Sequence, residues 1–168
     1  MSVEFDIKLA PKDMFRFNMY HTYTSFQGIF SLGLGVIVIL LAAITVGEVD
    51  LGYSILYFMF GILFLVYNPL SLYASSKRKI QKSEVLRNSL HYTFNEKGII
   101  VNVNEAKAEL IWNQIYKIVT TRHNLLIYST RRNAYIIPLE SLGGLYEPAT
   151  DIMKNQVESY RLKLRKIK

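Results

Sequence analysis

Three histidines, His21, His91 and His123, are the side chains of this 168-residue chain best suited to proton transfer or metal binding near neutral pH. A metal site needs several ligands at short spacing, or a histidine close to an acidic cluster. The three histidines have no paired spacing and no acidic cluster beside them in the sequence. We therefore predict that each is an interfacial or surface-turn residue, and that the chain has no metal site.

Two carboxylates, Glu105 and Glu109, stand four residues apart and are the nearest approach to a general acid–base pair. Their segment has the pattern of a loop and a strand, so we interpret them as a solvated edge. The absence of cysteine excludes disulfides, thiolate zinc sites and cysteine nucleophiles. The G-x-S-x-G, Walker A and G-x-G-x-x-G motifs are also absent. We predict no catalytic residue and no cofactor, and expect that the protein is not an enzyme.

Two uncharged apolar runs, Phe26–Val46 and Leu51–Tyr73, dominate the first half of the chain. They contain 21 and 23 residues, and as helices each could cross roughly 30 Å of hydrocarbon. Neither run has the charged face of a helix at the surface of a soluble domain. The sequence therefore predicts a membrane hairpin whose two spans are joined by the short turn Gly47–Asp50.

The charges that flank these runs predict an orientation. The turn carries Glu48 and Asp50 and no Lys or Arg, whereas basic residues flank the other two ends of the runs. Basic flanks stay in the cytoplasm, so we expect both termini there and the turn outside. The basic residues are Lys8, Lys12 and Arg16 before the first run, and Lys77, Arg78, Lys79, Lys82 and Arg87 after the second.

Each predicted span also carries a stripe of similar residues. Gly28, Gly35 and Ala42 repeat every seven residues on the first run, and small residues allow close helix packing. The second run carries aromatic residues at steps of three and four. We expect the aromatic stripe to pack on the small one, within one hairpin or across a dimer, with a ligand groove as the alternative. The aromatic residues are Tyr53, Tyr57, Phe60, Phe64 and Tyr67.

The N-terminal segment Val3–Leu9 alternates apolar and charged residues, which predicts a strand with one buried face. Such a strand needs a sheet, and we expect it to join the one predicted after residue 88. Pro11 then ends the strand, and Asp13 can cap a short helix that leads to the first span.

Beyond the second run, Ala74–Asn88 is predicted to continue the helix as a basic segment. Six short apolar runs then predict an antiparallel meander that forms a small bent sheet or open barrel, with Trp112 in a strand and in the core. A helix opened by Pro148 should cover one side with the stripe Met153, Val157, Tyr160, Leu164 and Ile167. The six runs are Leu90–Phe94, Ile99–Val103, Ala108–Trp112, Ile115–Thr121, Leu125–Tyr128 and Ala134–Pro138.

These patterns predict an α+β membrane protein in four parts. Residues 1–25 would form the N-terminal strand and a juxtamembrane helix. Residues 26–73 would form the transmembrane hairpin, with spans at 26–46 and 51–73. Residues 74–89 would form a basic helical juncture. Residues 90–168 would form the cytoplasmic domain with its C-terminal amphipathic helix.

Three segments carry a family resemblance, Leu90–Ile99, Ala108–Ile118 and Ile136–Pro138. Together with the two apolar runs they resemble the bacterial YcxB-like membrane proteins, from Asp13 to about Leu142. The soluble part of that family is similar to pleckstrin-homology-like (PH-like) domains. The resemblance implies a bacterial cell-membrane protein with a PH-like cytoplasmic sheet or open barrel, and it transfers no catalytic residue.

The basic excess of the second half predicts what this domain contacts. Residues 77–168 carry 17 Lys and Arg against 8 Asp and Glu, a net charge of +9. Near an anionic leaflet each basic group contributes about 1 kcal/mol of attraction, although basic residues at a helix end also complement the helix dipole. An anchored domain without exposed stacking aromatics disfavours nucleic acid. The candidate lipid-contact residues are Lys77, Arg78, Lys79, Arg161, Arg165 and Lys168.

Taken together, we expect a membrane-anchored cytoplasmic binding module that engages anionic lipid headgroups or a protein partner. The alternative is an accessory or regulatory subunit of a larger membrane complex, or a homodimer whose hairpins pack together. A membrane-embedded enzyme is a third hypothesis, disfavoured because no catalytic element is found.

Overall fold

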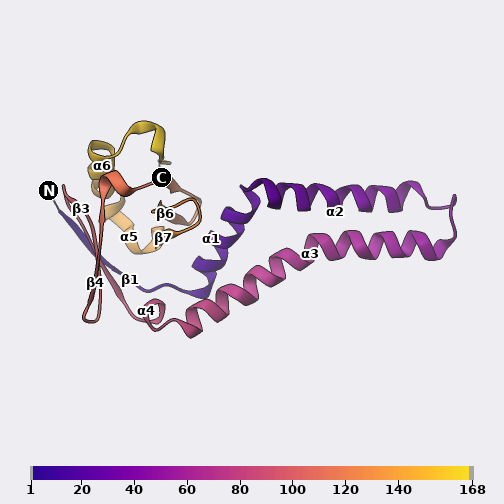
Figure 1. The fold of residues 1–168 in the computed structure, drawn as a ribbon, viewed down its shortest axis with the longest axis horizontal. Coiled ribbons are helices and arrows are strands. Elements are labelled where there is room, and N and C mark those ends of the chain that lie inside the picture. Colours follow the sequence, from indigo (N-terminus) through magenta and orange to yellow (C-terminus); the bar gives the residue numbers. More distant parts are fainter. Residues whose placement is uncertain (1, 167–168) are drawn as a thin grey trace. The chain divides into compact units, whose positions relative to one another are not determined.

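The computed structural model describes residues 2–166, and the chain divides into two compact units. Unit 1 comprises Met1–Phe17 and Lys77–Lys168, and unit 2 comprises Asn18–Ser76. Unit 2 is thus an insertion in the sequence of unit 1. Figure 1 shows the β-strands of unit 1 and the paired helices α2 and α3 of unit 2.

The first sheet of unit 1 has four antiparallel strands in the order β1-β2-β3-β4. The N-terminal strand pairs with β2 so that Val3 lies opposite Phe94 and Ile7 opposite Leu90. Alternate residues of β1 are buried, as the apolar alternation predicts. The predicted pairing of the N-terminal strand is therefore confirmed. The strands are β1 (Val3–Ile7), β2 (Leu90–Phe94), β3 (Gly98–Val103) and β4 (Ala106–Ile111).

The tight turn between β2 and β3 forms where the sequence predicts it. The Asn95 side chain accepts hydrogen bonds from the backbone N–H groups of Lys97 and Gly98, at 2.9 and 3.0 Å. Trp112 does not belong to a strand, contrary to our expectation, and instead begins the 3₁₀-helix η1 (Trp112–Gln114). It is buried, as expected, and its indole N–H donates to the Asn95 carbonyl at 2.8 Å, a bond that holds η1 beside the turn.

The second sheet has the order β7-β6-β5-β8, so unit 1 contains two sheets where a single sheet or open barrel was expected. The chain leaves the first sheet at η1, whose 3₁₀ turn ends the β4 ladder before β5 begins. Strands β5, β6 and β7 form an antiparallel meander. The strands are β5 (Lys117–Thr120), β6 (Asn124–Tyr128), β7 (Ala134–Pro138) and β8 (Leu162–Lys163).

The predicted C-terminal helix is wrong beyond residue 156. Helix α6 spans Tyr146–Gln156, and the chain then becomes extended at Val157. Strand β8 pairs in parallel with β5, with Leu162 opposite Ile118, and so satisfies an otherwise open sheet edge. Tyr160 is consequently 73% exposed instead of packed. Leu164 lies beyond β8 outside any helix, and Ile167 lies outside the described residues.

Helices lie between the strands of unit 1 and at the two junctions with unit 2. Helix α1 begins at Pro11, and the Asp13 carboxylate accepts a hydrogen bond from the Ala10 N–H at 3.1 Å, which caps its first turn. Helix α3 continues beyond Ala74 but ends at Lys82, short of the predicted Asn88, because the Ser83 hydroxyl caps a separate helix, α4. The helices are α1 (Pro11–Tyr23), α3 (Leu51–Lys82), α4 (Glu84–Arg87) and α5 (Leu139–Leu142), and η2 (Gly143–Leu145) and η3 (Ser159–Arg161) are 3₁₀ turns.

Unit 2 contains α2 (Phe26–Ile44) and the first part of α3, both long and apolar enough to cross a membrane. Gly28, Gly35 and Ala42 are the buried residues of α2. Gly28 faces Thr22 of α1, and Gly35 faces α3. A Cβ atom at Gly35 would collide with the Leu65 side chain.

Within the hairpin only part of the aromatic stripe of α3 packs on these small residues: Phe64 lies beside Gly35, whereas three other rings face outward. Packing across a dimer stays a prediction. Tyr53, Phe60 and Tyr67 are 59%, 48% and 64% exposed. The buried positions of α3 between Leu51 and Ser76 are small residues: Ser54, Gly61 and Ser76. Close approach of two helix backbones needs small residues on both helices, and bulky rings therefore turn outward.

Candidate functional site

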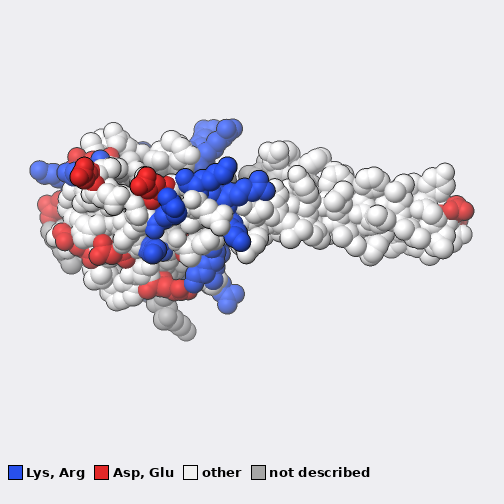
Figure 2. Space-filling model, turned by 90° about the horizontal axis from the view of Figure 1, so that it is seen from below, with Lys and Arg blue, Asp and Glu red and all other residues white. Residues whose placement is uncertain are grey.

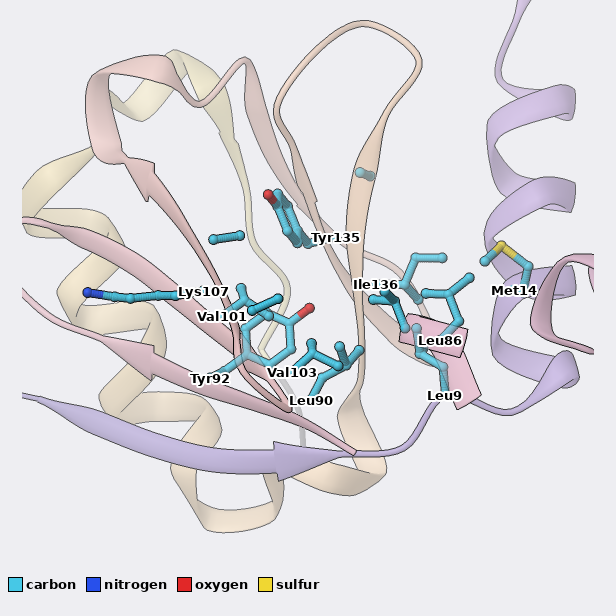
Figure 3. Close-up of a pocket in the computed structure, with 14 residues that line it drawn as sticks. Leu9, Met14, Leu86, Leu90, Tyr92, Val101, Val103, Lys107, Tyr135 and Ile136 are labelled. Carbon is cyan, nitrogen blue, oxygen red and sulfur yellow. The ribbon is translucent and has the colours of Figure 1, made fainter. Parts of the chain in front are cut away.

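A cavity of unit 1 lies over the inner face of the first sheet. Its walls come from strands β2, β3, β4 and β7, from helix α4 and from the segment around Leu9 and Met14 (Figure 3). Its volume is about 420 Å³, within the range of small-molecule sites. We consider it the candidate ligand site of the chain.

Three alanines create this space. Ala106 and Ala108 lie opposite Val103 and Val101 in the β3–β4 ladder, so they belong to the same inner face as those buried valines. Both alanines are nevertheless exposed, and Ala134 of β7 lies at the other wall. Alanine is a poor strand former and leaves the volume of a larger apolar side chain empty. The cavity therefore opens to solvent where β4 and β7 carry small residues.

The cavity has a polar and an apolar end. Leu9, Met14 and Leu86 line one end, and Tyr135 and Lys107 stand toward the other (Figure 3). The Lys107 side chain extends away from the cavity, and its Nζ lies 3.7 Å from a Glu109 carboxylate oxygen. The stem of Lys107 thus lines the rim while its charge stays in solvent.

Tyr92 carries the polar group that is most deeply placed in the cavity. It is only 2% exposed, and its hydroxyl has no hydrogen-bond partner among the described residues. Figure 3 shows this hydroxyl pointing into the cavity. Burial raises the pKa of the Tyr92 hydroxyl, and nearby Tyr135 raises this pKa further. At neutral pH the hydroxyl is therefore uncharged and free to donate or accept a hydrogen bond.

The candidate lipid-contact residues fall into two groups with different surroundings. Lys77, Arg78 and Lys79 are exposed on α3, while Ile80 on the same helix is buried. Among the described residues, none of these three basic groups has a carboxylate within 4.0 Å. They are available for an external anion.

The C-terminal candidates are less available. Arg161 lies 3.1 Å from a Glu158 carboxylate oxygen and donates to the Ile115 carbonyl at 3.1 Å, so it ties η3 to the start of β5. The side chain of Arg165 is exposed, and its backbone carbonyl accepts a hydrogen bond from the Tyr146 hydroxyl at 2.6 Å. Lys168 lies outside the described residues. Most Lys and Arg residues on the visible face of unit 1 gather on one half of that unit (Figure 2).

The three histidines lie in three different parts of the fold. His91 lies in β2, where its ring Nδ1 is 2.8 Å from an Asp6 carboxylate oxygen on the neighbouring strand. His123 lies in the turn between β5 and β6, as expected, and His21 lies in α1. Within residues 2–166 no group of three potential ligands could hold a metal ion. His91 and Asp6 form an exposed cross-strand pair.

Sequence reasoning missed the cavity. It identified the strands that line it but not the empty space between them, because space depends on how two sheets face each other. One signal was available: Ala106, Ala108 and Ala134 place small residues in strands otherwise rich in Ile, Val and Leu. Tyr92 gave no signal, because an alternating strand fits a tyrosine on either face.

Comparison with known families identifies one match. Residues 94–147 match the family model described as YcxB-like protein, which confirms the family resemblance over that segment. The match runs from the end of β2 through both sheets to the start of α6. No curated protein and no solved structure matches the chain.

Proposed function

We propose that this chain is a membrane-anchored binding module of the bacterial cell membrane. In this proposal unit 2 crosses the bilayer twice, and unit 1 is a PH-like domain that contacts anionic lipid headgroups from the cytoplasmic side. The observation that carries the proposal is the apolar outer surface of unit 2. A helix pair with such a surface is stable in the hydrocarbon of a bilayer and not in water.

The outward side chains of unit 2 are those of a lipid-facing surface. Phe30, Leu40 and Leu63 are 61%, 55% and 55% exposed. Residues 18–76 contain no Lys or Arg, and their only acids, Glu48 and Asp50, lie in the turn. Figure 2 shows a long surface without charge that ends in acidic atoms. An apolar patch of this extent would drive aggregation in water, whereas hydrocarbon covers it without cost.

The orientation and the PH-like assignment are supported by separate features. Basic residues lie on both chain segments that enter unit 2, at Arg16 and at Lys77, whereas the turn has none. This asymmetry supports cytoplasmic termini. Two small sheets, and a helix α6 that follows the β5–β7 meander, support a PH-like unit. The YcxB-like match over 94–147 covers most of these strands.

Lipid contact is supported by the group Lys77, Arg78 and Lys79. These side chains follow residue 76 directly on α3, which ties them to the proposed span by less than one helical turn of chain. Exposed basic groups without carboxylate partners retain their full charge for an anionic surface. The attraction acts within a Debye length, so it should weaken as salt is added.

The test uses the full chain reconstituted into nanodiscs that contain phosphatidylglycerol and phosphatidylcholine. Spin-labelled forms of each lipid report which headgroup the protein retains at its surface. We expect selectivity for phosphatidylglycerol that falls on replacing Lys77, Arg78 and Lys79 with Gln, and with added salt. The matched control replaces Arg131, Arg132 and Lys154, three exposed basic residues. Equal selectivity in the first variant and the wild type would overturn the lipid contact.

The alternative, an accessory subunit or a homodimer, is favoured by one observation. The aromatic stripe of α3 is exposed along the hairpin, from Tyr53 to Tyr67. Aromatic rows on a lipid-facing helix suit packing against another membrane helix as well as against lipid. The two cases are separated by cross-linking the full chain through a photoreactive residue at position 60, in place of Phe60. A product of twice the mass of the chain indicates a second copy, and a product of any other mass indicates a different subunit.

A further inference from the structure

The cavity of unit 1 has features that a surface contact with headgroups does not require. It combines an apolar interior with the Tyr92 hydroxyl, which points into the cavity and makes no hydrogen bond to the described residues. A tyrosine hydroxyl that faces an apolar cavity can fix the orientation of a bound ligand through one hydrogen bond. An external hydrogen-bonding group that enters the cavity would satisfy the Tyr92 hydroxyl.

We propose that this cavity binds a long-chain fatty acid, with its carboxyl group at the Tyr92 and Tyr135 hydroxyls and its hydrocarbon chain directed toward Leu9, Met14 and Leu86. In this orientation the polar end of the ligand lies at the polar end of the cavity, and its apolar chain lies along the apolar lining (Figure 3).

The lining favours a hydrocarbon chain over a polar metabolite. Most of the residues around the cavity are apolar, and the polar side chains among them are Tyr92, Tyr135 and Lys107. A polar metabolite would lose its water here without gaining partners for most of its groups. A fatty acid has one polar group, which matches a cavity with one polar end.

The lining also favours an acyl chain over a peptide strand. An extended peptide along the edge of β4 would bring a carbonyl and an N–H into the cavity with every residue. Among the side chains that line the cavity, only the hydroxyls of Tyr92 and Tyr135 could form hydrogen bonds with these peptide groups. The far end is lined by Leu9, Met14 and Leu86, which suits a methyl terminus.

This proposal is independent of the proposed headgroup contact. Fatty-acid binding uses the inner face of the first sheet and β7, whereas headgroup contact uses Lys77, Arg78 and Lys79 on α3. Variants of one group leave the other unaltered, so each proposal can fail while the other stands.

The test labels the full chain in phosphatidylcholine nanodiscs with a fatty acid that carries a photoreactive diazirine near its methyl end. Labelled peptides are identified by mass spectrometry, and unlabelled palmitate is the competitor. We expect competed labelling around Leu9, Met14 and Leu86. Labelling of α2 and α3 by probe dissolved in the bilayer serves as the internal reference. Labelling confined to those two helices would overturn the proposal.

Two variants of β4 test whether the space itself is needed. Ala108→Leu fills the cavity from its inner face and should reduce competed labelling at least tenfold. Glu109→Leu adds the same side chain to the opposite face of the same strand and should leave labelling unchanged. Both variants should melt at or near the wild-type temperature. Unchanged labelling of a folded Ala108→Leu variant would contradict a ligand in this cavity.

Tyr92→Phe tests the position of the carboxyl group. The variant keeps the ring and removes only the hydroxyl, so we expect about a five- to tenfold loss of fatty-acid affinity. A diazirine-bearing hydrocarbon of the same length, without the carboxyl group, should label the wild type and the variant equally. A Tyr92→Phe protein that binds the fatty acid as tightly as the wild type would overturn the assigned orientation.

Discussion

The aromatic ring of Phe5 lies parallel to that of Tyr92, with ring centroids 5.6 Å apart and planes 1° from parallel. Phe5 comes from the N-terminal strand and Tyr92 from the strand that follows the inserted unit 2. The segment that precedes the apolar hairpin therefore supports the wall of the cavity that follows it. Unit 1 is therefore built from chain segments on both sides of unit 2.

Phe5→Ala tests this dependence. Phe5 is buried and also contacts Phe94 edge to face at 5.2 Å, so we expect a loss of about 3–5 kcal/mol of unfolding free energy. Thermal and denaturant unfolding of the full chain, followed by Trp112 fluorescence, measures it. The control, Glu4→Ala, alters an exposed residue of the same strand and should change stability by less than about 0.5 kcal/mol. Equal stability of both variants would show that β1 adds nothing to unit 1.

Tyr92→Phe should cost no folding stability at neutral pH, because the hydroxyl makes no hydrogen bond within the described residues. At alkaline pH the two proteins should differ. The folded state raises the pKa of Tyr92 above its ordinary value of 10.0, so the unfolded chain ionises first. The stability of the wild type should therefore fall as the pH rises above about 10.

The measurement is the difference in unfolding free energy between wild type and Tyr92→Phe from pH 8 to pH 11. The other tyrosines titrate in both proteins and cancel in the difference. We expect the variant to gain relative stability only above about pH 10. A difference that stays constant over the whole range would contradict the burial of an un-ionised Tyr92.

Tyr160→Asp tests the corrected C-terminal segment. Tyr160 is 73% exposed, so the change should cost less than about 1 kcal/mol. A helix extending to residue 167 would have buried this ring and made the same change unfold unit 1. Met153→Ala is the matched comparison, because Met153 is fully buried on α6 and should cost about 2–5 kcal/mol. Strong destabilisation by Tyr160→Asp would restore the helical interpretation.

Local patterns predict much of this fold. Alternation in Val3–Ile7 and the turn at Asn95–Gly98 predicted elements that the structure contains, because each depends on neighbours in the chain. The C-terminal error arose because Met153 and Val157 fit a helical spacing, whereas Tyr160, Leu162 and Leu164 alternate with basic residues as in a strand. The open edge of β5 decides between the two patterns, and no local pattern reveals that edge.

The candidate site was less predictable than the fold. Basic residues such as Lys77 are visible in any sequence, but their exposure and lack of carboxylate partners depend on the folded unit. Arg161 has the same charge, yet η3 places it beside Glu158 and the Ile115 carbonyl. The cavity depends on two sheets and three alanines that only the fold brings together.

The central claim, that unit 2 spans the membrane with unit 1 in the cytoplasm, is tested most directly by cysteine accessibility. The natural chain has no cysteine, so a single introduced thiol is its only target. Two variants are compared, Val49→Cys in the turn of unit 2 and Glu105→Cys in the β3–β4 turn of unit 1. Intact cells that produce each variant are treated with a maleimide that reaches the outer face of the cell membrane but cannot cross that membrane. We expect Val49→Cys to react in intact cells and Glu105→Cys to react only after lysis. Labelling of Glu105→Cys in intact cells, or protection of Val49→Cys until lysis, would contradict the account.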